Sequence, residues 1–260
     1  MLFRSSAAAS APVELPAGFT VAGGPSGMLL PFRTSRPLTV LPVDVRALQS
    51  FDGVRYSDNT RAWHAGLPFL PWGDDPQAAA TDQANAAPAL YIGLDSSPAA
   101  GARLSLWLSL AGPPDASAER QRIAEEARRQ EAACRPVLPQ PCDDQALAPE
   151  DGESHIEAAR QHHGAACSWE FYDGSGWSAL QVDDETRCLT LDGGVTVTVP
   201  PGLRSLTLGT VDEPLWYLRC RLSAGRPDQA PILRTLQLNA VEAEQVSEAR
   251  STFEVLPGVQ

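Results

Sequence analysis

Residues 103–110 read RLSLWLSL, and this stretch is the clearest indication of the fold class. Leucines occupy every second position and alternate with serines and one tryptophan; the leucines are Leu104, Leu106, Leu108 and Leu110. A repeat of two residues is typical of a β-strand with one buried face. Because burial of a leucine stabilises a fold by about 1.5 to 3 kcal/mol, we expect the leucine face to point inward. Trp107 stands on the opposite, polar face, and this pattern does not explain it.

Similar strand patterns lie on both sides of this stretch and are separated by turn residues. They are LYIGLD (90–95), CSWEFYDGSGWSALQV (167–182), GVTVTVP (194–200), SLTLGTV (205–211), LWYLRCRL (215–222) and ILRTLQLNAV (232–241). Within the second of these, DGSG has the composition of a hairpin turn between two aromatic runs. Strands at this spacing predict an all-β protein whose main domain, residues 88–241, is an antiparallel β-sandwich or jelly-roll-like domain.

The rest of the chain divides by composition. Residues 1–12 are expected to be disordered. Residues 13–60 contain short apolar runs between Gly and Pro turns and predict a small amino-terminal β unit. Residues 61–87, rich in proline and alanine, predict a linker or a strap laid over a surface. Residues 242–260 are expected to form a carboxy-terminal extension.

A long insertion at residues 113–166 interrupts the predicted sandwich. Its composition changes abruptly to Ala, Glu, Arg, Gln and Pro. Residues 117–133, SAERQRIAEEARRQEAA, predict a helix. Ile123 is the only large apolar residue in this helix, so we expect the helix to lie on the surface. The proline-rich and acidic remainder predicts a solvated loop.

Composition narrows the classes of function. The chain has 260 residues, of which 43% are hydrophobic, so it can bury a core without metals or disulfides. A formal net charge of -12 is expected to repel nucleic acid and anionic membrane surfaces. The basic residues are all arginine, which excludes the chemistry of a Schiff-base or P-loop lysine. No apolar run suits a signal peptide or a membrane span, so we expect cytoplasmic assembly and no membrane insertion.

Residues that could carry chemistry form no recognised motif. Five possible metal ligands have a spacing unlike that of a zinc site: Cys134, Cys142, His162, His163 and Cys167. Acidic residues that could pair for glycoside hydrolysis show no division into acid and base: Asp143, Asp144, Glu170, Asp183, Asp184 and Glu185. Neither GGPSGM nor DGSGW has the form of a serine nucleophile elbow. We therefore expect no catalytic residue, no metal and no cofactor, with a zinc-stapled insertion as the open alternative.

A candidate interaction surface comes from the alternation in residues 215–222. Tyr217, Arg219 and Arg221 share one strand face, opposite Trp216 and its apolar neighbours. Tyrosine and arginine are favoured at protein interfaces, so this face could contact a partner, with an ordinary solvated face as the alternative. In residues 167–182 the same alternation turns Trp169 and Phe171 toward the core and leaves Tyr172 as the more exposed ring, another possible contact.

The order of the motifs resembles a known family. LPAGFTV (15–21) and LLPFRTSRPLTVLPVDV (29–45) are similar to the opening text of baseplate assembly proteins from phage-tail-like contractile injection systems. The later segments are similar to that family in the same order: FLPWGDDP, ALYIGLD, LSLWLSL, WEFYDGSGWSALQVDDETRCLT, VTVTVP, LWYLRCRL and ILRTLQLNAV. The resemblance covers most of residues 13–245. The long insertion departs from it, since a direct strand connection is expected there.

The resemblance implies a structural role and supplies no catalytic residue. It implies a wedge-type component of a baseplate that assembles in the cytoplasm and becomes part of a phage-tail-like particle. Its expected partners are the other baseplate, spike or sheath subunits, bound through sheet faces and the inserted helix. A different class of function stays open: several tryptophans and tyrosines could stack on sugar rings, as in a carbohydrate-binding β-sandwich module.

Overall fold

The leucine-alternating stretch forms β8 (Arg103–Leu110), an inner strand of a four-stranded sheet. The computed structural model describes residues 11–24, 29–74, 80–81, 84–112, 114–133 and 164–246. The strand order of this sheet is β11 (Val182–Asp184), β12 (Gly193–Thr198), β8 and β15 (Leu233–Leu238), with neighbouring strands antiparallel. The strand predicted from the leucine repeat is therefore confirmed.

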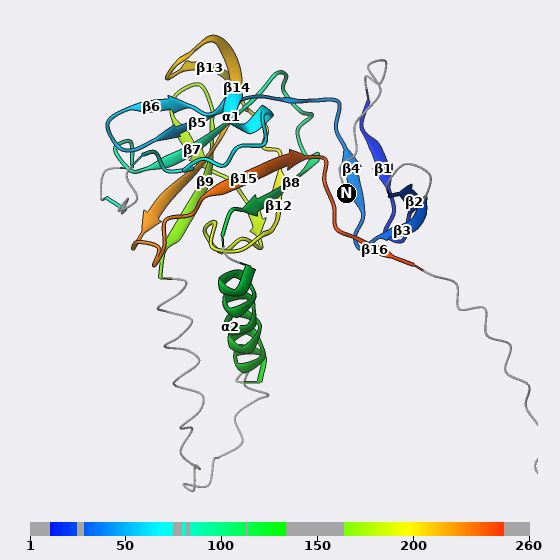
Figure 1. Cartoon of the computed structure of the whole chain (residues 1–260). Helices are drawn as coiled ribbons and strands as arrows, with labels where there is room; N and C mark the ends of the chain where they lie inside the picture. Colours follow the sequence, from blue (N-terminus) through cyan, green and yellow to red (C-terminus); the bar gives the residue numbers. More distant parts are fainter. Residues whose placement is uncertain are drawn as a thin grey trace, which may run out of the picture.

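A larger antiparallel sheet forms the second layer (Figure 1). Its seven strands run in the order β10 (Trp177–Ala179), β9 (Ala166–Tyr172), β14 (Val211–Ala224), β7 (Ala89–Leu94), β5 (Val45–Phe51) and β6 (Tyr56–Asp58), with β13 (Ser205–Leu208) paired to β14. The sequence pattern of two aromatic runs around DGSG corresponds to the β9–β10 hairpin, in which Trp177 lies opposite Tyr172. The predicted all-β sandwich is confirmed.

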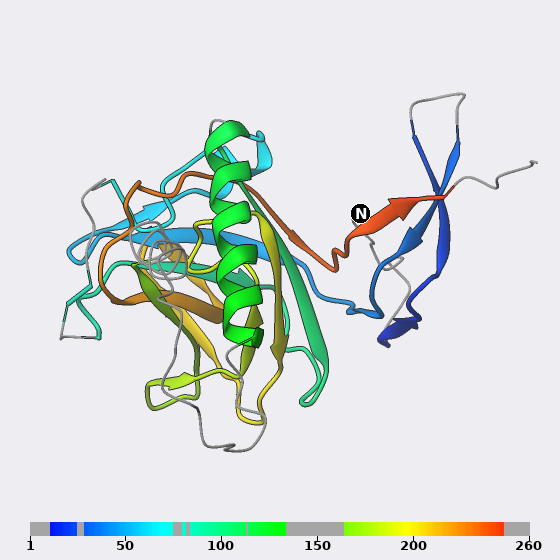
Figure 2. The ribbon, with the colours of Figure 1, turned by 90° about the horizontal axis from the view of Figure 1, so that it is seen from below.

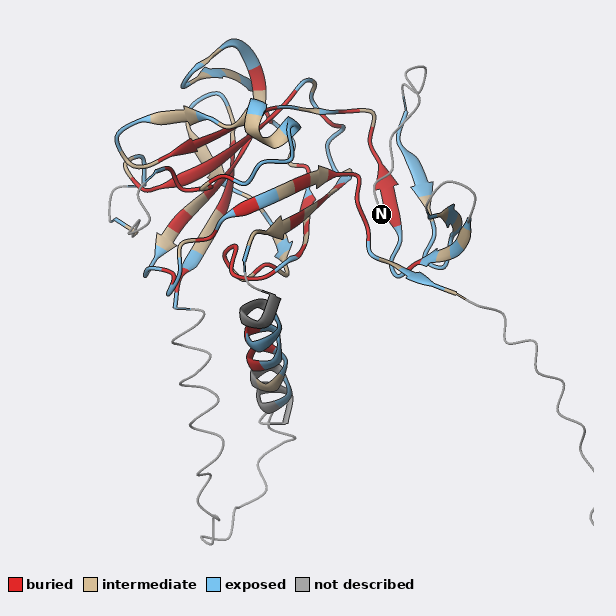
Figure 3. Ribbon diagram, viewed as in Figure 1, coloured by how far each residue is buried: buried red, intermediate tan, exposed pale blue. Residues whose placement is uncertain are grey.

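The main core lies between the two sheets, where buried segments are concentrated (Figure 3). Leu104, Leu106 and Leu108 are at most 1% exposed, so the predicted leucine face does point inward. Across the strand pairs, Leu106 lies opposite Val195 on one side and opposite Leu238 on the other. Apolar neighbours opposite each other on one sheet face add to the stability of the sheet.

The outer face of the large sheet carries a second, smaller core. Its buried members are Ala47, Phe51, Ala89, Tyr91, Leu215 and Tyr217. Partly buried apolar side chains from β6, β10, β13 and the start of β14 pack against them: Tyr56, Trp177, Leu206, Leu208 and Val211. Tyr91 and Trp177 contact each other edge to face, with ring centroids 5.4 Å apart. This face of the large sheet is therefore covered by the protein itself.

The predicted boundary between a small β unit at 13–60 and a sandwich at 88–241 is wrong. β5 and β6 belong to the large sheet, in which β5 pairs with β7 along its length. β16 (Ala243–Gln245), predicted as part of the carboxy-terminal extension 242–260, pairs with β3 instead. Turn residues mark where strands end, but they carry no information about which distant strand is the partner.

A small lobe stands beside the sandwich (Figure 2). It contains a three-stranded sheet of β16, β3 (Leu30–Thr34) and β2 (Thr20–Gly23), and a pair formed by β1 (Val13–Leu15) and β4 (Leu38–Val40). Its buried apolar residues are few: Leu38, Val40 and Val241 form one cluster, with Leu15 against it. So small a core gives the lobe little stability of its own, and contact with the sandwich has to supply the rest.

Part of the connection between β6 and β7 of the large sheet lies along β15, an edge strand of the other sheet. α1 (Thr60–His64) begins after β6, and the Trp63 indole Nε1 donates a hydrogen bond of 2.9 Å to the carbonyl of Leu236. Phe69 forms an isolated bridge with Leu233 through two backbone hydrogen bonds of 2.9 and 2.8 Å. Part of the segment predicted as a linker or strap, residues 61–87, thus covers the edge of a sheet.

The helix predicted at 117–133 is present as α2 (Pro114–Ala133). It follows β8 and leaves the sandwich at one end (Figure 1). The Arg120 guanidinium forms a salt bridge with Asp228, in the loop before β15, and the side chain of Arg120 is only 11% exposed. Residues 134–163, most of the remaining insertion, and residues 1–10 of the expected disordered terminus lie outside the described residues.

Candidate functional site

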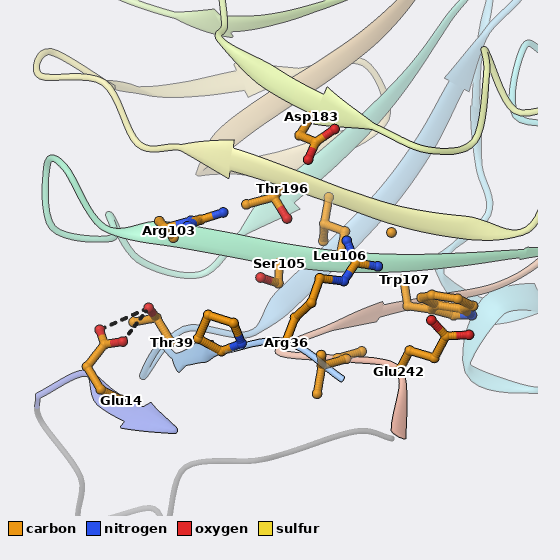
Figure 4. Close-up of a pocket in the computed structure, with 14 residues that line it drawn as sticks. Glu14, Arg36, Thr39, Arg103, Ser105, Leu106, Trp107, Asp183, Thr196 and Glu242 are labelled. Atoms are coloured by element: carbon orange, nitrogen blue, oxygen red, sulfur yellow. Dashed lines mark hydrogen bonds between the residues drawn. The ribbon is translucent and has the colours of Figure 1, made fainter. Parts of the chain in front are cut away.

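An open cleft lies between the small lobe and the outer face of the four-stranded sheet (Figure 4). It has a volume of about 350 Å³. β8 and β12 supply its floor, because their inward side chains are the leucines and valines of the core and their alternate residues must face outward. The small lobe supplies its other wall through β1, β4 and residues 240–242.

The floor of the cleft explains the tryptophan that interrupted the polar face of the predicted strand. Trp107 is half-buried and lines the cleft together with Ser105 and Thr196. In Figure 4 its ring lies at the same end of the cleft as Glu242, whereas Arg103 and Glu14 lie toward the other end. An amphipathic ring therefore stands among polar side chains at a surface hollow, which is an arrangement suited to a ligand or a partner chain.

Charged contacts tie the two walls of the cleft together. Arg36 of the small lobe pairs with Glu185 of the sandwich through two parallel hydrogen bonds of 2.7 and 2.9 Å. The hydrogen bond with Glu185 raises the pKa of Arg36. Both side chains are more than a third exposed, so this pair adds little stability. Its contribution is to orient the small lobe with respect to the sandwich. Within the small-lobe wall itself, the Thr39 hydroxyl donates to the carboxylate of Glu14.

Asn239 fixes the junction at which the chain crosses between the lobe and the sandwich. Its side-chain oxygen accepts a hydrogen bond of 2.9 Å from the Leu41 amide, and its side-chain nitrogen donates one of 2.9 Å to the Leu41 carbonyl. Its own amide donates to the Ser105 carbonyl of β8 at 2.8 Å. Asn239 adopts φ 56°, a left-handed conformation that asparagine tolerates better than most residues. The outgoing and returning segments are therefore held side by side.

The predicted interaction surface on β14 is not a surface, and this part of the prediction is wrong. Tyr217 is fully buried and Arg219 is 2% exposed, while Arg221 is half-buried. The Gln49 side-chain amide donates a hydrogen bond of 3.0 Å to the Tyr217 hydroxyl, and burial raises the pKa of Tyr217 to about 12. The alternating sequence pattern correctly separated the two faces of the strand. The face that carries Tyr217 and Arg219, however, packs into the smaller core and is not exposed to solvent.

Arg219 and Arg221 share one carboxylate, that of Glu170. The Arg219 Nε donates to Glu170 Oε2 at 2.6 Å, and the Arg221 Nη2 donates to Glu170 Oε1 at 3.0 Å. The Arg219 guanidinium also lies over the ring of Trp177. Tyr172, the remaining residue of the predicted surface, is half-buried, and its hydroxyl donates to the Gly174 carbonyl at 3.0 Å.

Several of the acidic residues considered as catalytic candidates have structural contacts. Glu170 is held by the two arginines, Glu185 by Arg36, and Asp184 caps the turn that follows β11. Asp183 is exposed and lines the cleft. The other two candidates, Asp143 and Asp144, lie outside the described residues, as do four of the possible metal ligands: Cys134, Cys142, His162 and His163. The fifth, Cys167, lies in β9.

Three features of this region were not predicted from the sequence. The cleft depends on the lobe folding back over β8, and Asn239 gives no sign in the sequence of its left-handed backbone. The convergence of Cys167 with Cys188 and Cys220 joins residues from three separate segments. A cysteine count could have raised the question, since these thiols are free, but spacing alone could not pair them.

The fold and the cleft define an all-β sandwich protein with a polar surface hollow. No protein-family model matches the chain, and no curated protein matches it. Within the described ranges, neither helix is long and apolar enough to cross a membrane. Over the same residues, no three His, Cys, Asp or Glu side chains are grouped as a metal site requires.

Proposed function

We propose that this chain is a structural component of the baseplate of a contractile, phage-tail-like injection particle, acting by binding and linking neighbouring subunits. The observation that carries the proposal is how the resembling motifs meet in space. Glu170 and Trp177 of WEFYDGSGW contact Arg219 of LWYLRCRL in one buried network. The segments that carry the resemblance therefore pack against one another within this sandwich. Residues at packing positions are the ones that proteins of the same fold are expected to share.

The arrangement of the two lobes also suits a linking role. The small lobe has little core of its own, yet two chain segments and the Arg36–Glu185 pair hold it on the sandwich. The cleft between them presents a concave surface, and α2, which follows the floor strand β8, lies below the sandwich in Figure 1. Separate contact surfaces on one subunit would allow it to join two neighbours. An enzymatic role is not part of the proposal, because the paired contacts of Glu170, Asp184 and Glu185 serve the fold.

Affinity purification of the tagged chain from its native host tests the proposal. Sheath, tube and spike proteins are expected to co-purify, with particles visible by negative-stain microscopy. A reversal of charge in the cleft, Arg103→Glu, is expected to reduce this recovery. The control is Arg55→Glu, an arginine that is also exposed and lies in the β5–β6 turn outside the cleft. If the unmodified protein and the control variant were each recovered as a lone monomer, the baseplate proposal would be overturned.

A second function, glycan binding, is favoured by one specific observation. Trp107 lies in the cleft among hydroxyl and carboxylate side chains, which is the kind of surface on which a sugar ring stacks and forms hydrogen bonds. Retention on polysaccharide resin, lost in Trp107→Ala, would support this function. Equal retention of the unmodified protein and the variant would exclude the cleft as a sugar site.

A further inference from the structure

Three free thiols from distant parts of the chain converge at one edge of the main core. Cys188 is 4% exposed and Cys220 is fully buried, and both belong to the cluster between the sheets. Cys167, at the start of β9, packs against this cluster and is only partly buried. The three thiols shift one another's pKa, which also indicates that they lie close together.

Cys188 is carried by an unusual turn of the backbone. Arg187, Cys188 and Leu189 all have positive φ, at 48°, 62° and 58°. None of them is glycine, and each such residue costs about 1 to 2 kcal/mol relative to an ordinary conformation. The turn is closed by backbone hydrogen bonds of 2.9 Å from Thr190 and Leu191 to the Thr186 carbonyl. A strained turn of this kind persists only where its surroundings fix it.

Asp184 fixes this turn with respect to Cys167. Its Oδ1 accepts hydrogen bonds from the amide and the hydroxyl of Thr186, at 2.8 and 2.6 Å, where the turn begins. Its Oδ2 accepts a bond of 3.0 Å from the Trp169 indole and lies 3.6 Å from the Cys167 sulfur. One carboxylate thus holds both the strand that carries Cys167 and the turn that carries Cys188.

The strand register decides which thiol is the partner of Cys167. In the β9–β14 pair, Cys167 lies opposite Leu222, while Cys220 lies opposite Trp169. Cys167 and Cys220 are therefore diagonal neighbours, about 7 to 8 Å apart across the strand pair, with somewhat less between their Cβ atoms. A disulfide needs Cβ atoms about 3.5 to 4.5 Å apart. Cys188 comes from a turn outside this ladder and is not held to that spacing.

We infer that Cys167 and Cys188 form a reversible disulfide that joins the two sheets of the sandwich. Cys167 lies in the large sheet, and Cys188 lies in the connection between β11 and β12 of the four-stranded sheet. The Cys167 thiolate attacks a low-molecular-weight disulfide, such as oxidised glutathione, and releases one thiol. The Cys188 sulfur then displaces the second thiol and loses its proton. Two protein thiols are oxidised, and one external disulfide is reduced to two thiols.

The environment of Cys167 suits it to the first step. It is the most accessible of the three thiols. Hydrogen bonds from Cys188 and Cys220 lower the pKa of Cys167 to about 6, against burial and the neighbouring Asp184, which both raise it. A thiolate is the attacking species in this exchange. Under the proposed function, the bond would form once the particle leaves the reducing cytoplasm.

Oxidation of the full chain with oxidised glutathione tests this inference. The sequence also contains Cys134 and Cys142, so both are changed to serine in every sample. Peptide mapping without reduction is expected to recover a Cys167–Cys188 link, with the loss of two hydrogens from the intact mass. Because the bond closes a loop of residues 167–188 in the unfolded chain, the melting temperature is expected to rise by about 5 °C and to return on reduction.

Two single variants separate the possible partners. Cys220→Ser is expected to keep the link and the rise in melting temperature, whereas Cys188→Ser is expected to lose both and to hold glutathione on Cys167. Circular dichroism and cooperative melting confirm that each variant is folded. Three results would overturn the inference: a stable mixed disulfide in the protein that keeps all three thiols, a link from Cys167 to Cys220, or no reaction of the folded protein.

Discussion

The guanidinium carbon of Arg219 lies 4.3 Å from the centre of the Trp177 ring, on the outer face of the large sheet. The same side chain is a cross-strand neighbour of Glu170 and pairs with it. β14, β9 and the edge strand β10 are thereby connected by side chains as well as by backbone hydrogen bonds. Arg219, which the strand pattern placed on a candidate interaction surface, is therefore part of an internal contact.

The first prediction concerns the buried carboxylate of this network. Glu170→Ala leaves Arg219 and Arg221 without their shared partner in a buried site, and is expected to lower the free energy of unfolding by about 3 to 5 kcal/mol. The control is Arg46→Ala, which breaks the exposed pair with Glu213 and is expected to cost less than about 1 kcal/mol. Urea unfolding measures both. Equal losses would contradict a structural role for the buried pair.

The second prediction concerns Asn239. Two substitutions separate the contribution of its side-chain hydrogen bonds to stability from that of its left-handed backbone conformation. Asn239→Gly keeps the left-handed backbone but leaves the Leu41 amide and carbonyl unpaired, at a cost of about 1 to 3 kcal/mol. Asn239→Ala adds about 1 to 2 kcal/mol for the left-handed conformation. Arg36→Ala, which removes the exposed contact between the same two lobes, is expected to cost less than about 1 kcal/mol. If glycine at 239 destabilised as much as alanine, the backbone argument would fail.

A third prediction concerns the pH dependence of the hairpin turn after β9. The Asp173 carboxylate accepts hydrogen bonds from the Ser178 hydroxyl at 2.7 Å and from the Ser175 and Gly176 amides, and these bonds lower the pKa of Asp173. Because the folded-state pKa lies below the unfolded one, the stabilisation is complete above about pH 4 and is lost as the pH falls further.

Asp173→Ala is therefore expected to destabilise the protein near neutral pH and to differ less from the unmodified protein in acid. Chemical unfolding of both proteins, repeated at several pH values down to about pH 3, measures the difference. Ser178→Ala, which removes the strongest of these bonds, is expected to show the same trend with a smaller amplitude. A difference independent of pH would show that the carboxylate charge does not matter to the turn.

The fourth prediction concerns the attachment of α2. Arg120→Ala removes the largely buried salt bridge with Asp228, and hydrogen exchange in residues 114–133 is expected to become faster. Arg122→Ala removes an exposed pair with Glu119 inside the same helix, and is expected to change exchange much less. Hydrogen exchange followed by mass spectrometry compares the two. The same acceleration in both variants would mean that the helix is not anchored through Arg120.

The sequence predicted the strands well because their pattern is local. The leucine repeat at 103–110, the aromatic hairpin at 167–182 and the helix at 117–133 each depend on neighbouring residues alone. It failed where the answer depends on distant partners. Nothing near Val45–Phe51 indicates that this strand pairs with Ala89–Leu94. In the same way, nothing near Tyr217 indicates that Gln49 and the apolar residues of β13 cover it.

The candidate site follows the same rule. Alternation predicted that Trp107 faces away from the core, but the wall opposite it comes from residues far away in the chain. A strand pattern shows only that the two faces of the strand differ. Whether the polar face is exposed depends on which other segments of the chain pack against it. The cleft, the buried arginines and the converging thiols are all products of tertiary packing.

The clamp between Asn239 and Leu41 has a mechanical consequence. The chain enters the small lobe and leaves it at the same point, along two adjacent segments joined by paired hydrogen bonds. A pull on the lobe would load both segments in parallel and pass, through the Ser105 contact, into an inner strand of the four-stranded sheet. The two segments would thus share the tension. The force would act on β8, which is hydrogen-bonded to a neighbouring strand on each side, so that several backbone hydrogen bonds resist it together.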